Sequence, residues 1–248
     1  RKDGYHNIET YFQLINLYDE IILSIIPGSK INFVSNNNLF LSSENLCVKA
    51  AELLRAYVNG GDSLNASIKL SKNIPIGGGL GGGSSNAAFV LLGLNNLWKC
   101  NLTKKELLDL GGKLGADVPI FINGFSAYGE QTGNILTKHS LKKKYFLIVD
   151  TGIQVSSKNM YEQYKIKGCI KHINLDNMHR NIGFNSFEDL LCVQNPEIKD
   201  LLQTLRKYDN GSVSGSGGCL FSMFDDEVSA QNISKLIPKK YQTYIVHS

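Results

Sequence analysis

The chain has 248 residues, and 42% of them are hydrophobic. This is enough for one large domain or two modest ones, with a core that is stable without disulfide bonds or bound metals. A formal net charge of +4 is too small to indicate a nucleic-acid partner, and no run approaches the roughly 20 apolar residues of a membrane span. The five cysteines are an odd number at wide spacing without a C-x-x-C pair, which disfavours disulfide and zinc frameworks and favours a reducing cytoplasm.

The N-terminal part of the chain predicts two strands, a helix and a third strand. An apolar run predicts a strand over 21–26 that Pro27 ends, and residues 31–34 are predicted to pair with it. Apolar residues at helical spacing predict a helix over 44–58. Residues 66–70 then predict a strand that leads into a glycine-rich segment.

This glycine-rich segment has six glycines within residues 77–83, and an apolar helix that begins near Ser84 follows it. Such a backbone can take positive φ angles and lie directly against a ligand. A glycine-rich loop at a helix N-terminus presents free N–H groups and the positive end of the helix dipole to an anion. The segment therefore predicts a phosphate-binding loop.

Three other interpretations of the glycine-rich segment are weaker. A P-loop requires a lysine at the position where Ser84 follows Gly83. The dinucleotide fingerprint G-x-G-x-x-G does match, but no Asp or Glu lies between Gly83 and Lys105 to bind a ribose. A flexible glycine linker agrees poorly with the apolar segments that flank the loop on both sides.

The remaining elements follow one another without regular βαβ alternation, which indicates an α+β protein. Thr103 and Glu106 form a capping box for a helix that ends near Leu114. The pattern also predicts a helix over 187–208 that is broken at Pro196. Further strands are predicted over 126–130, 145–149, 219–224 and 243–246, with a helix over 226–237.

Asp117 is the only carboxylate between Asp109 and Glu130, and apolar residues surround it in the sequence. A buried carboxylate in such company is costly unless it is paired or used in chemistry. An aspartate ahead of Pro119 is equally typical of a helix N-cap or a turn. The residues alone leave the catalytic and the structural interpretation open.

The stretch from Pro75 to Ala88 resembles the phosphate loop of the GHMP kinases. Segments over 3–6, 9–13, 44–46 and 114–121 are similar, in the same order, to the branch of that superfamily whose acceptor carries a cytidine diphosphate group. The resemblance implies a two-domain α+β fold with the active site in the interdomain cleft. The expected domains are a nucleotide domain over 1–143 and a C-terminal domain over 144–248, divided near a short basic run.

The resemblance implies an enzyme that transfers a phosphoryl group from ATP to the 2-hydroxyl of a cytidine diphosphate-linked methylerythritol, in the non-mevalonate isoprenoid pathway. ATP and this polyol would be its partners, with Mg²⁺ carried by the nucleotide, no metal ligands of the protein's own, no nucleic acid and no membrane. Two alternatives stay open. One is a GHMP kinase for homoserine, mevalonate or a sugar, and the other is a nucleotide-binding regulator on the same fold.

The resemblance also implies which residues bind ATP. The set comprises Asn45, Lys72, Pro75, Gly77, Gly78, Gly79, Leu80, Gly81, Gly82, Gly83, Ser84 and Ser85. Plain structural roles stay open for several of them, because Asn45 could be a first-turn helix residue and Lys72 a solvated loop residue. Ser84 or Ser85 could cap the helix, contact phosphate or Mg²⁺, or do both.

By the same resemblance, Asp117 accepts or orients the proton of the attacking hydroxyl. Tyr5 would stack on the cytosine and His6 would hydrogen-bond to it. The other residues expected on the acceptor side are Phe12, Tyr161, Gly215, Ser216 and Gly217. The lysine that normally accompanies the aspartate belongs to a Pro-Ala-Lys-x-Asn-Leu segment, which we expect upstream of Arg1, since neither Lys2 nor Lys30 lies in such a motif.

Overall fold

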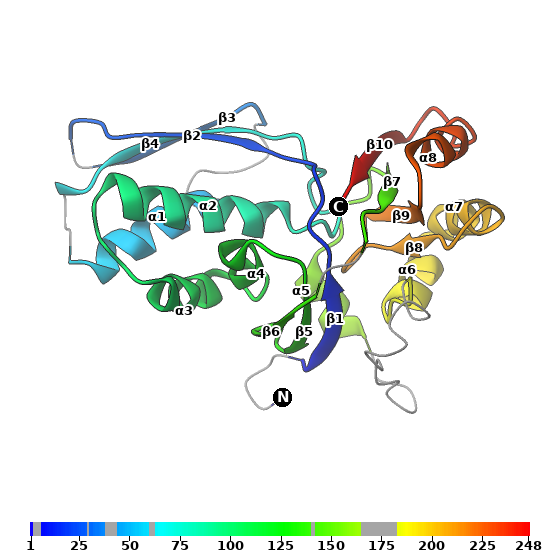
Figure 1. The fold of residues 1–248 in the computed structure, drawn as a ribbon, viewed down its shortest axis with the longest axis horizontal. Helices are drawn as coiled ribbons and strands as arrows, with labels where there is room; N and C mark the ends of the chain where they lie inside the picture. Colours follow the sequence, from blue (N-terminus) through cyan, green and yellow to red (C-terminus); the bar gives the residue numbers. More distant parts are fainter. Residues whose placement is uncertain (2–5, 29, 38–43, 60–62, 140–141, 165–182) are drawn as a thin grey trace. The chain divides into compact units, whose positions relative to one another are not determined.

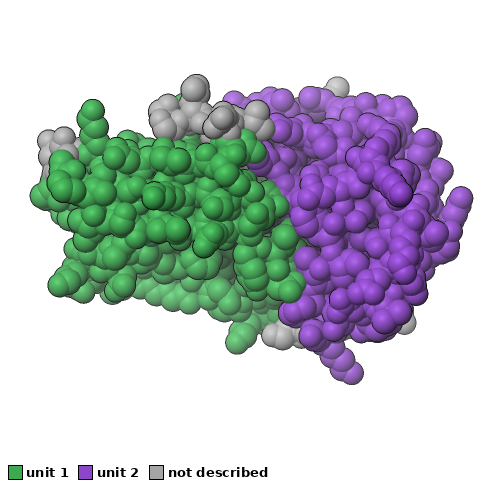
Figure 2. Space-filling model, turned by 90° about the horizontal axis from the view of Figure 1, so that it is seen from above, with its two compact units in different colours: residues 1–74, 81–140 green, residues 75–80, 141–248 purple. Residues whose placement is uncertain are grey.

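The computed structural model describes the whole chain except residues 2–5, 29, 38–43, 60–62, 140–141 and 165–182 (Figure 1). The chain forms two compact units, coloured separately in Figure 2. Unit 1 comprises residues 1–74 and 81–140, and unit 2 comprises residues 75–80 and 141–248. Both units combine helices with mainly antiparallel sheets, so the α+β prediction is confirmed.

The larger sheet of unit 1 has the order β2-β4-β3, formed by Glu20–Ser24, Ala66–Ser71 and Ile31–Ser35. The prediction that residues 31–34 pair with the strand before them is therefore wrong. β4 separates the two, antiparallel to β2 and parallel to β3. The physical reason lies in burial, because Ala66, Ile68 and Leu70 of β4 are fully or almost fully buried while alternate residues of β2 and β3 are exposed.

In the described part of unit 1, four helices complete the core. They are α1 (Leu46–Tyr57), α2 (Gly82–Leu97), α3 (Lys104–Leu114) and α4 (Val118–Asn123). α1 and α2 lie along one face of the β2-β4-β3 sheet, and α3 and α4 pack on α2 (Figure 1). Gly93 permits the close approach of α2 to β2, since a Cβ there would lie 2.4 Å from Leu23 Cδ1.

The capping box that begins α3 is confirmed. The Thr103 hydroxyl accepts a hydrogen bond from Glu106 N, and the Glu106 carboxylate accepts one from Thr103 N at 2.8 Å. These bonds satisfy two of the N–H groups that the start of a helix leaves without an intrahelical acceptor. The two residues therefore fix where α3 begins.

A smaller antiparallel sheet of unit 1 has the order β1-β5-β6. Its strands are Ile8–Phe12, Ala127–Gln131 and Ile135–Lys138, and the first and last of them were not predicted. The Ser126 hydroxyl accepts hydrogen bonds from Gln13 Nε2 and Leu14 N, at 2.9 and 3.0 Å. The chain that leaves β1 is thereby fixed to the start of β5.

Unit 2 contains an antiparallel sheet in the order β10-β7-β9-β8. These strands are Gln242–His247, Tyr145–Asp150, Cys219–Phe224 and Ser212–Val213. Its helices are α5 (Ser157–Gln163), α6 (Glu188–Gln194), α7 (Pro196–Arg206) and α8 (Glu227–Ser234). The predicted break at Pro196 is confirmed, because this residue takes the first position of α7 and Asn195 leaves the helical conformation at φ −135°.

Among the residues that the structure describes, no helix combines the length and the apolar character needed to cross a membrane.

Candidate active site

The glycine-rich segment is divided between the two units, with Pro75–Leu80 in unit 2 and the chain from Gly81 onward in unit 1. Its first half packs on a second glycine loop of unit 2, between β8 and β9. A Cβ on Gly79 would lie 2.0 Å from Ser214 O, and one on Gly218 would lie 2.3 Å from Gly77 O. No side chain can enter such contacts, so these glycines are required for the packing of one backbone against another.

Hydrogen bonds join the same two loops. Cys219 N donates to Gly78 O at 2.9 Å, and the Ser214 hydroxyl donates to Gly79 O at 3.0 Å. Gly215 also lies against Gly79, since a Cβ on it would be 2.8 Å from Gly79 O. The loop that holds Gly215, Ser216 and Gly217 is therefore a support for the first half of the glycine-rich segment.

The second half of the segment forms the N-terminus of α2. Gly81 occupies the N-cap position in the left-handed conformation, with φ +69°, and α2 begins at Gly82 rather than near Ser84 as predicted. The left-handed cap allows the chain to turn into the helix earlier than a serine cap would. The first intrahelical bond runs from Ser85 N to Gly81 O at 2.8 Å.

Three N–H groups, those of Gly82, Gly83 and Ser84, therefore precede the first intrahelical hydrogen bond. Gly81 holds the N-cap position, so neither Ser84 nor Ser85 is the N-cap residue. Both hydroxyls instead belong to the first turn of α2. This turn has the donors and the dipole orientation of an anion-binding site.

Asp117 lies in the turn between α3 and α4, and Gly115 at the start of this turn lies near the first turn of α2. The Ser84 hydroxyl is 4.0 Å from the position that a Cβ on Gly115 would take, two residues before Asp117. Asp117 occupies the N-cap position of α4, yet its side chain makes no capping hydrogen bond. The N-cap alternative is thus correct in that Asp117 occupies the N-cap position, but its carboxylate does not cap the helix.

The environment of Asp117 alters its acidity. Asp117 is partly buried and directly precedes the buried residues Val118 and Pro119, and desolvation raises the pKa of its carboxyl above the usual value. No hydrogen bond or ion pair reaches this carboxylate from the part of the chain that the structure describes. A perturbed carboxylate of this kind is a candidate proton acceptor.

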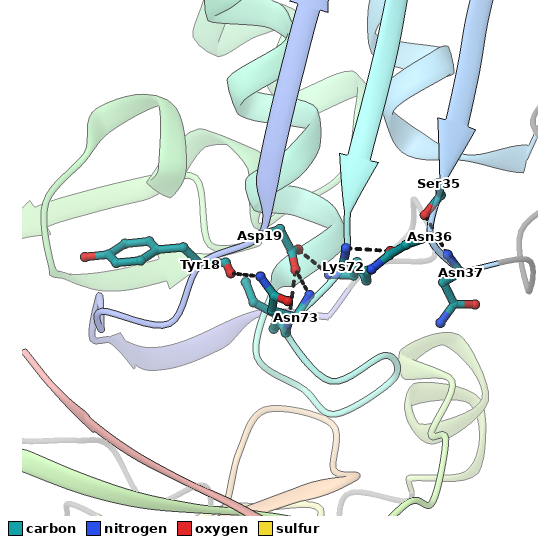
Figure 3. A network of polar contacts seen from close by, with 8 residues as sticks. Tyr18, Asp19, Ser35, Asn36, Asn37, Lys72 and Asn73 are labelled. Atoms are coloured by element: carbon teal, nitrogen blue, oxygen red, sulfur yellow. Dashed lines mark hydrogen bonds and ion pairs between the residues drawn. The ribbon is translucent and has the colours of Figure 1, made fainter.

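The sequence reasoning missed Asp19, which contacts the predicted ATP-binding residue Lys72. Its carboxylate forms an ion pair with Lys72 and accepts hydrogen bonds from Asn73 N and Ile74 N at 2.7 and 2.8 Å (Figure 3). The exposed fractions of the Asp19 and Lys72 side chains are 1% and 7%. Lys72 is therefore not a solvated loop residue, as the structural alternative had it.

Asn45 occupies the N-cap position of α1. Its side-chain oxygen accepts a hydrogen bond from Cys47 N at 2.9 Å, and only 7% of the residue is exposed. Burial raises the pKa of Cys47 to about 12, so this thiol stays neutral and belongs to the core. The structure thus assigns Asn45 a capping role, and its contact with ATP stays a prediction.

The predicted acceptor residues lie in both units. In unit 1, His6 is partly buried just before β1, and the Phe12 ring covers Gly129, where a Cβ would lie 2.6 Å from it. Tyr5 lies outside the described residues. In unit 2, the Tyr161 ring meets Phe187 edge to face, with 4.9 Å between ring centroids.

The loop residue Ser216 is buried, and its hydroxyl hydrogen-bonds to the Ser157 hydroxyl at 2.7 Å. Gly217 has φ +115° and lies against Leu191, whose Cδ1 would be 2.6 Å from a Cβ there. Both residues therefore have structural partners within unit 2. Their role toward an acceptor stays a prediction.

Sequence comparisons place both parts of the chain in known families. Residues 45–125 match the family described as GHMP kinases N terminal domain, and residues 166–243 match GHMP kinases C terminal. The 4-diphosphocytidyl-2-C-methyl-D-erythritol kinase of Buchnera aphidicola subsp. Schizaphis graminum is 40% identical, over 100% of this chain and 87% of the relative. The enzyme of that name from Ruthia magnifica subsp. Calyptogena magnifica is 38% identical, over 100% and 88%.

Solved structures give the same result. A crystal structure of 4-(cytidine 5'-diphospho)-2C-methyl-D-erythritol kinase matches with a TM-score of 0.84 and 26% identity, over 100% of this chain and 92% of the other. A homoserine kinase from Cytophaga hutchinsonii shares the fold alone, with a TM-score of 0.71 and 17% identity over 94% and 87%. The chain therefore belongs to the 4-diphosphocytidyl-2-C-methyl-D-erythritol kinase family of the GHMP kinases.

Proposed function

We propose that this kinase transfers the γ-phosphoryl group of ATP to the 2-hydroxyl of 4-diphosphocytidyl-2-C-methyl-D-erythritol. The names of the relatives support this substrate. The observation that carries the chemistry is Asp117, a desolvated carboxylate without a hydrogen-bond partner in the described chain, close to a helix N-terminus with free N–H groups. These are the two features that phosphoryl transfer to an alcohol requires.

The N-terminus of α2 is the proposed phosphate site. The N–H groups of Gly82, Gly83 and Ser84 donate to phosphate oxygens, and the helix dipole favours their negative charge. A hydroxyl of Ser84 or Ser85 contacts a phosphate oxygen or the Mg²⁺ that the nucleotide carries. Such a metal neutralises charge on the phosphates. Among the described residues, no group of three or more His, Cys, Asp or Glu side chains could hold a metal ion.

Asp117 is the proposed catalytic residue. Its carboxylate accepts, or orients, the proton of the acceptor hydroxyl as this oxygen attacks the γ-phosphorus. The desolvation that raises its pKa makes it a stronger base than an exposed aspartate. The absence of a capping bond leaves both carboxylate oxygens available for this proton.

The cytidine group is the proposed specificity element. Tyr5 stacks on the base and His6 hydrogen-bonds to it, with Phe12 and Tyr161 as further aromatic residues of the acceptor site. Stacking of a base on an aromatic ring is worth about 1–3 kcal/mol, which is enough to select a cytidine-bearing substrate over a bare polyol. We place the enzyme in the cytoplasm, and we keep 1–143 and 144–248 as its functional domains.

Steady-state kinetics with both substrates test this function. The purified protein is expected to consume ATP only when the cytidine-bearing polyol is present, and to release ADP and a product phosphorylated at its 2-hydroxyl. Homoserine and mevalonate are the comparison acceptors, and a preference for either would contradict the assignment. Tyr5→Ala and His6→Ala should raise KM for the acceptor by about 5- to 150-fold and leave KM for ATP almost unchanged.

A further inference from the structure

The Asp19 carboxylate is surrounded by donors from one short stretch of chain. One of its oxygens accepts the N–H groups of Asn73 and Ile74, at 2.7 and 2.8 Å, and the other pairs with the Lys72 ammonium (Figure 3). Asp19 lies directly before β2, and these three residues follow directly after β4. The carboxylate thus holds the chain at the point where it leaves the sheet for the glycine-rich segment.

The third strand of the sheet holds the same stretch from the other side. The Asn36 side-chain oxygen accepts a hydrogen bond from Lys72 N at 2.8 Å, and Asn36 N donates to Leu70 O at 3.2 Å. Figure 3 shows Asp19, Lys72 and Asn36 side by side below the ends of the three strands. Lys72 is therefore fixed by both neighbouring strands through its side chain and its backbone.

The ammonium of Lys72 also reaches the start of α2. A Cβ on Gly82 would lie 2.8 Å from Lys72 Nζ and 3.0 Å from Ile74 Cγ2. A cation beside a helix N-terminus opposes the helix dipole when it is alone, and it adds to the attraction for an anion bound there. Asp19 supplies the negative charge that keeps the ammonium in this place.

A buried ion pair is weak support for stability, because apolar residues of similar volume often replace such a pair without loss. The value of this pair therefore lies in what it positions. We propose that Asp19 is a positioning residue of the nucleotide site. It holds the Lys72 ammonium beside Gly82 and directs the chain into the phosphate loop, and both effects favour ATP. This inference rests on the proposed function.

Four variants test the proposal: Asp19→Ala, Asp19→Asn, Lys72→Met and the double variant Asp19→Asn/Lys72→Met. Glu197→Gln is the matched control, because it breaks an exposed ion pair with Lys240. The measurements are KM for each substrate and the Kd of a non-hydrolysable ATP analogue by calorimetry. Asp19→Ala is expected to raise KM and Kd for the nucleotide about 10- to 100-fold, with KM for the acceptor and the control variant within about twofold of wild type.

Asp19→Asn keeps an oxygen for the two backbone N–H groups and loses the ion pair, so its effect should be smaller than that of alanine. Lys72→Met should lower nucleotide affinity less in the Asp19→Asn background than in the wild type. The reason is that the ammonium has already lost its partner in the Asp19→Asn variant. Equal increases in KM for both substrates, or lower kcat with unchanged KM for ATP, would show a merely structural role and overturn the proposal. If Asp19→Ala fails to fold, the asparagine and methionine variants decide.

The same experiment keeps this inference apart from the proposed function. Wild-type protein that binds the ATP analogue without phosphorylating the cytidine-bearing acceptor contradicts the proposed substrate, and calorimetry of the variants still decides the role of Asp19. If the wild type phosphorylates the acceptor and the variants bind the analogue as tightly as the wild type does, only the role of Asp19 is contradicted. Wild-type protein that binds no ATP analogue overturns both.

Discussion

Two aspartates of unit 1 have opposite surroundings. Asp19 is 1% exposed and satisfied by an ammonium and two backbone N–H groups. Asp117 is partly buried, and no hydrogen bond from the described residues reaches its carboxylate. Desolvation without such partners raises the pKa of the Asp117 carboxyl, and its proposed role as a proton acceptor rests on this difference. The comparison teaches that burial alone does not set the acidity of a carboxylate, because its hydrogen-bond and ion-pair partners act on the pKa as well.

The largest effect that separates the two aspartates concerns turnover. Asp117→Asn removes the proton acceptor and keeps the shape of the side chain, so kcat should fall about 10²- to 10⁴-fold. ATP affinity should stay within a few-fold of wild type, because the N–H donors of α2 are unchanged. Single-turnover kinetics and calorimetry check both values. The control is Asp109→Asn, an exposed carboxylate of α3, and a wild-type kcat in the Asp117 variant would remove this residue from the mechanism.

The first turn of α2 lies near the surroundings of both aspartates. Gly82 lies against the Lys72 ammonium that Asp19 binds, and the Ser84 hydroxyl lies near Gly115, two residues before Asp117. Valine at Gly81, where φ is +69°, or at Gly82, next to Lys72 and Ile74, should reduce ATP affinity about a hundredfold. Calorimetry measures this loss, and circular dichroism checks that the fold persists. Gly112→Ala is the control, because a Cβ there meets nothing within 4 Å. Normal ATP affinity in a folded valine variant would exclude this turn as the phosphate site.

Stability should change in opposite directions at the two aspartates. Asp19→Asn leaves the buried Lys72 ammonium without its partner, and such a loss typically lowers the free energy of unfolding by about 3–5 kcal/mol. Asp117→Asn removes an unpaired charge from a desolvated site, so the free energy of unfolding at pH 7 should rise. Urea denaturation of the two variants and the wild type compares them directly. A change of the same sign in both variants would contradict the contrast between a paired and an unpaired carboxylate.

The smallest expected effect is the pH dependence of the stability that Asp117→Asn gains over the wild type. The folded-state pKa of Asp117 is raised, so its stabilising contribution is complete below the unfolded-state pKa and is lost as pH rises through the folded-state value. Asp117→Asn should therefore gain stability over the wild type as pH increases from about 3 to 7, relative to an unfolded-state pKa of about 3.9. Thermal unfolding of both proteins over this range measures the difference. A Tm difference that stays constant with pH would show that Asp117 keeps an ordinary pKa.

The local chemistry of several elements could be read directly from the chain. Thr103 and Glu106 begin α3 through a capping box, and Pro196 separates α6 from α7, because both effects act within a few residues. The glycine-rich segment likewise predicts a helix N-terminus, which the structure has at Gly82, whereas phosphate binding there stays a prediction. The sequence also singled out Asp117 as an unusual carboxylate among apolar residues, although it could not decide between a cap and a catalytic base.

Contacts between distant residues were decided only by the tertiary structure. The pairing of β2 with β4 places Glu20 opposite Ser71, and this register brings Asp19 beside Lys72, 53 residues later in the chain. The sequence also could not show that Gly79 packs on Ser214 and Gly218 on Gly77. The glycines of each loop leave room for the backbone of another loop, and only the folded chain shows which loop that is. Local rules of capping and propensity act over one or two helical turns. Strand order and loop packing instead depend on which apolar faces the whole chain buries together, and this determines which charged groups meet at the site.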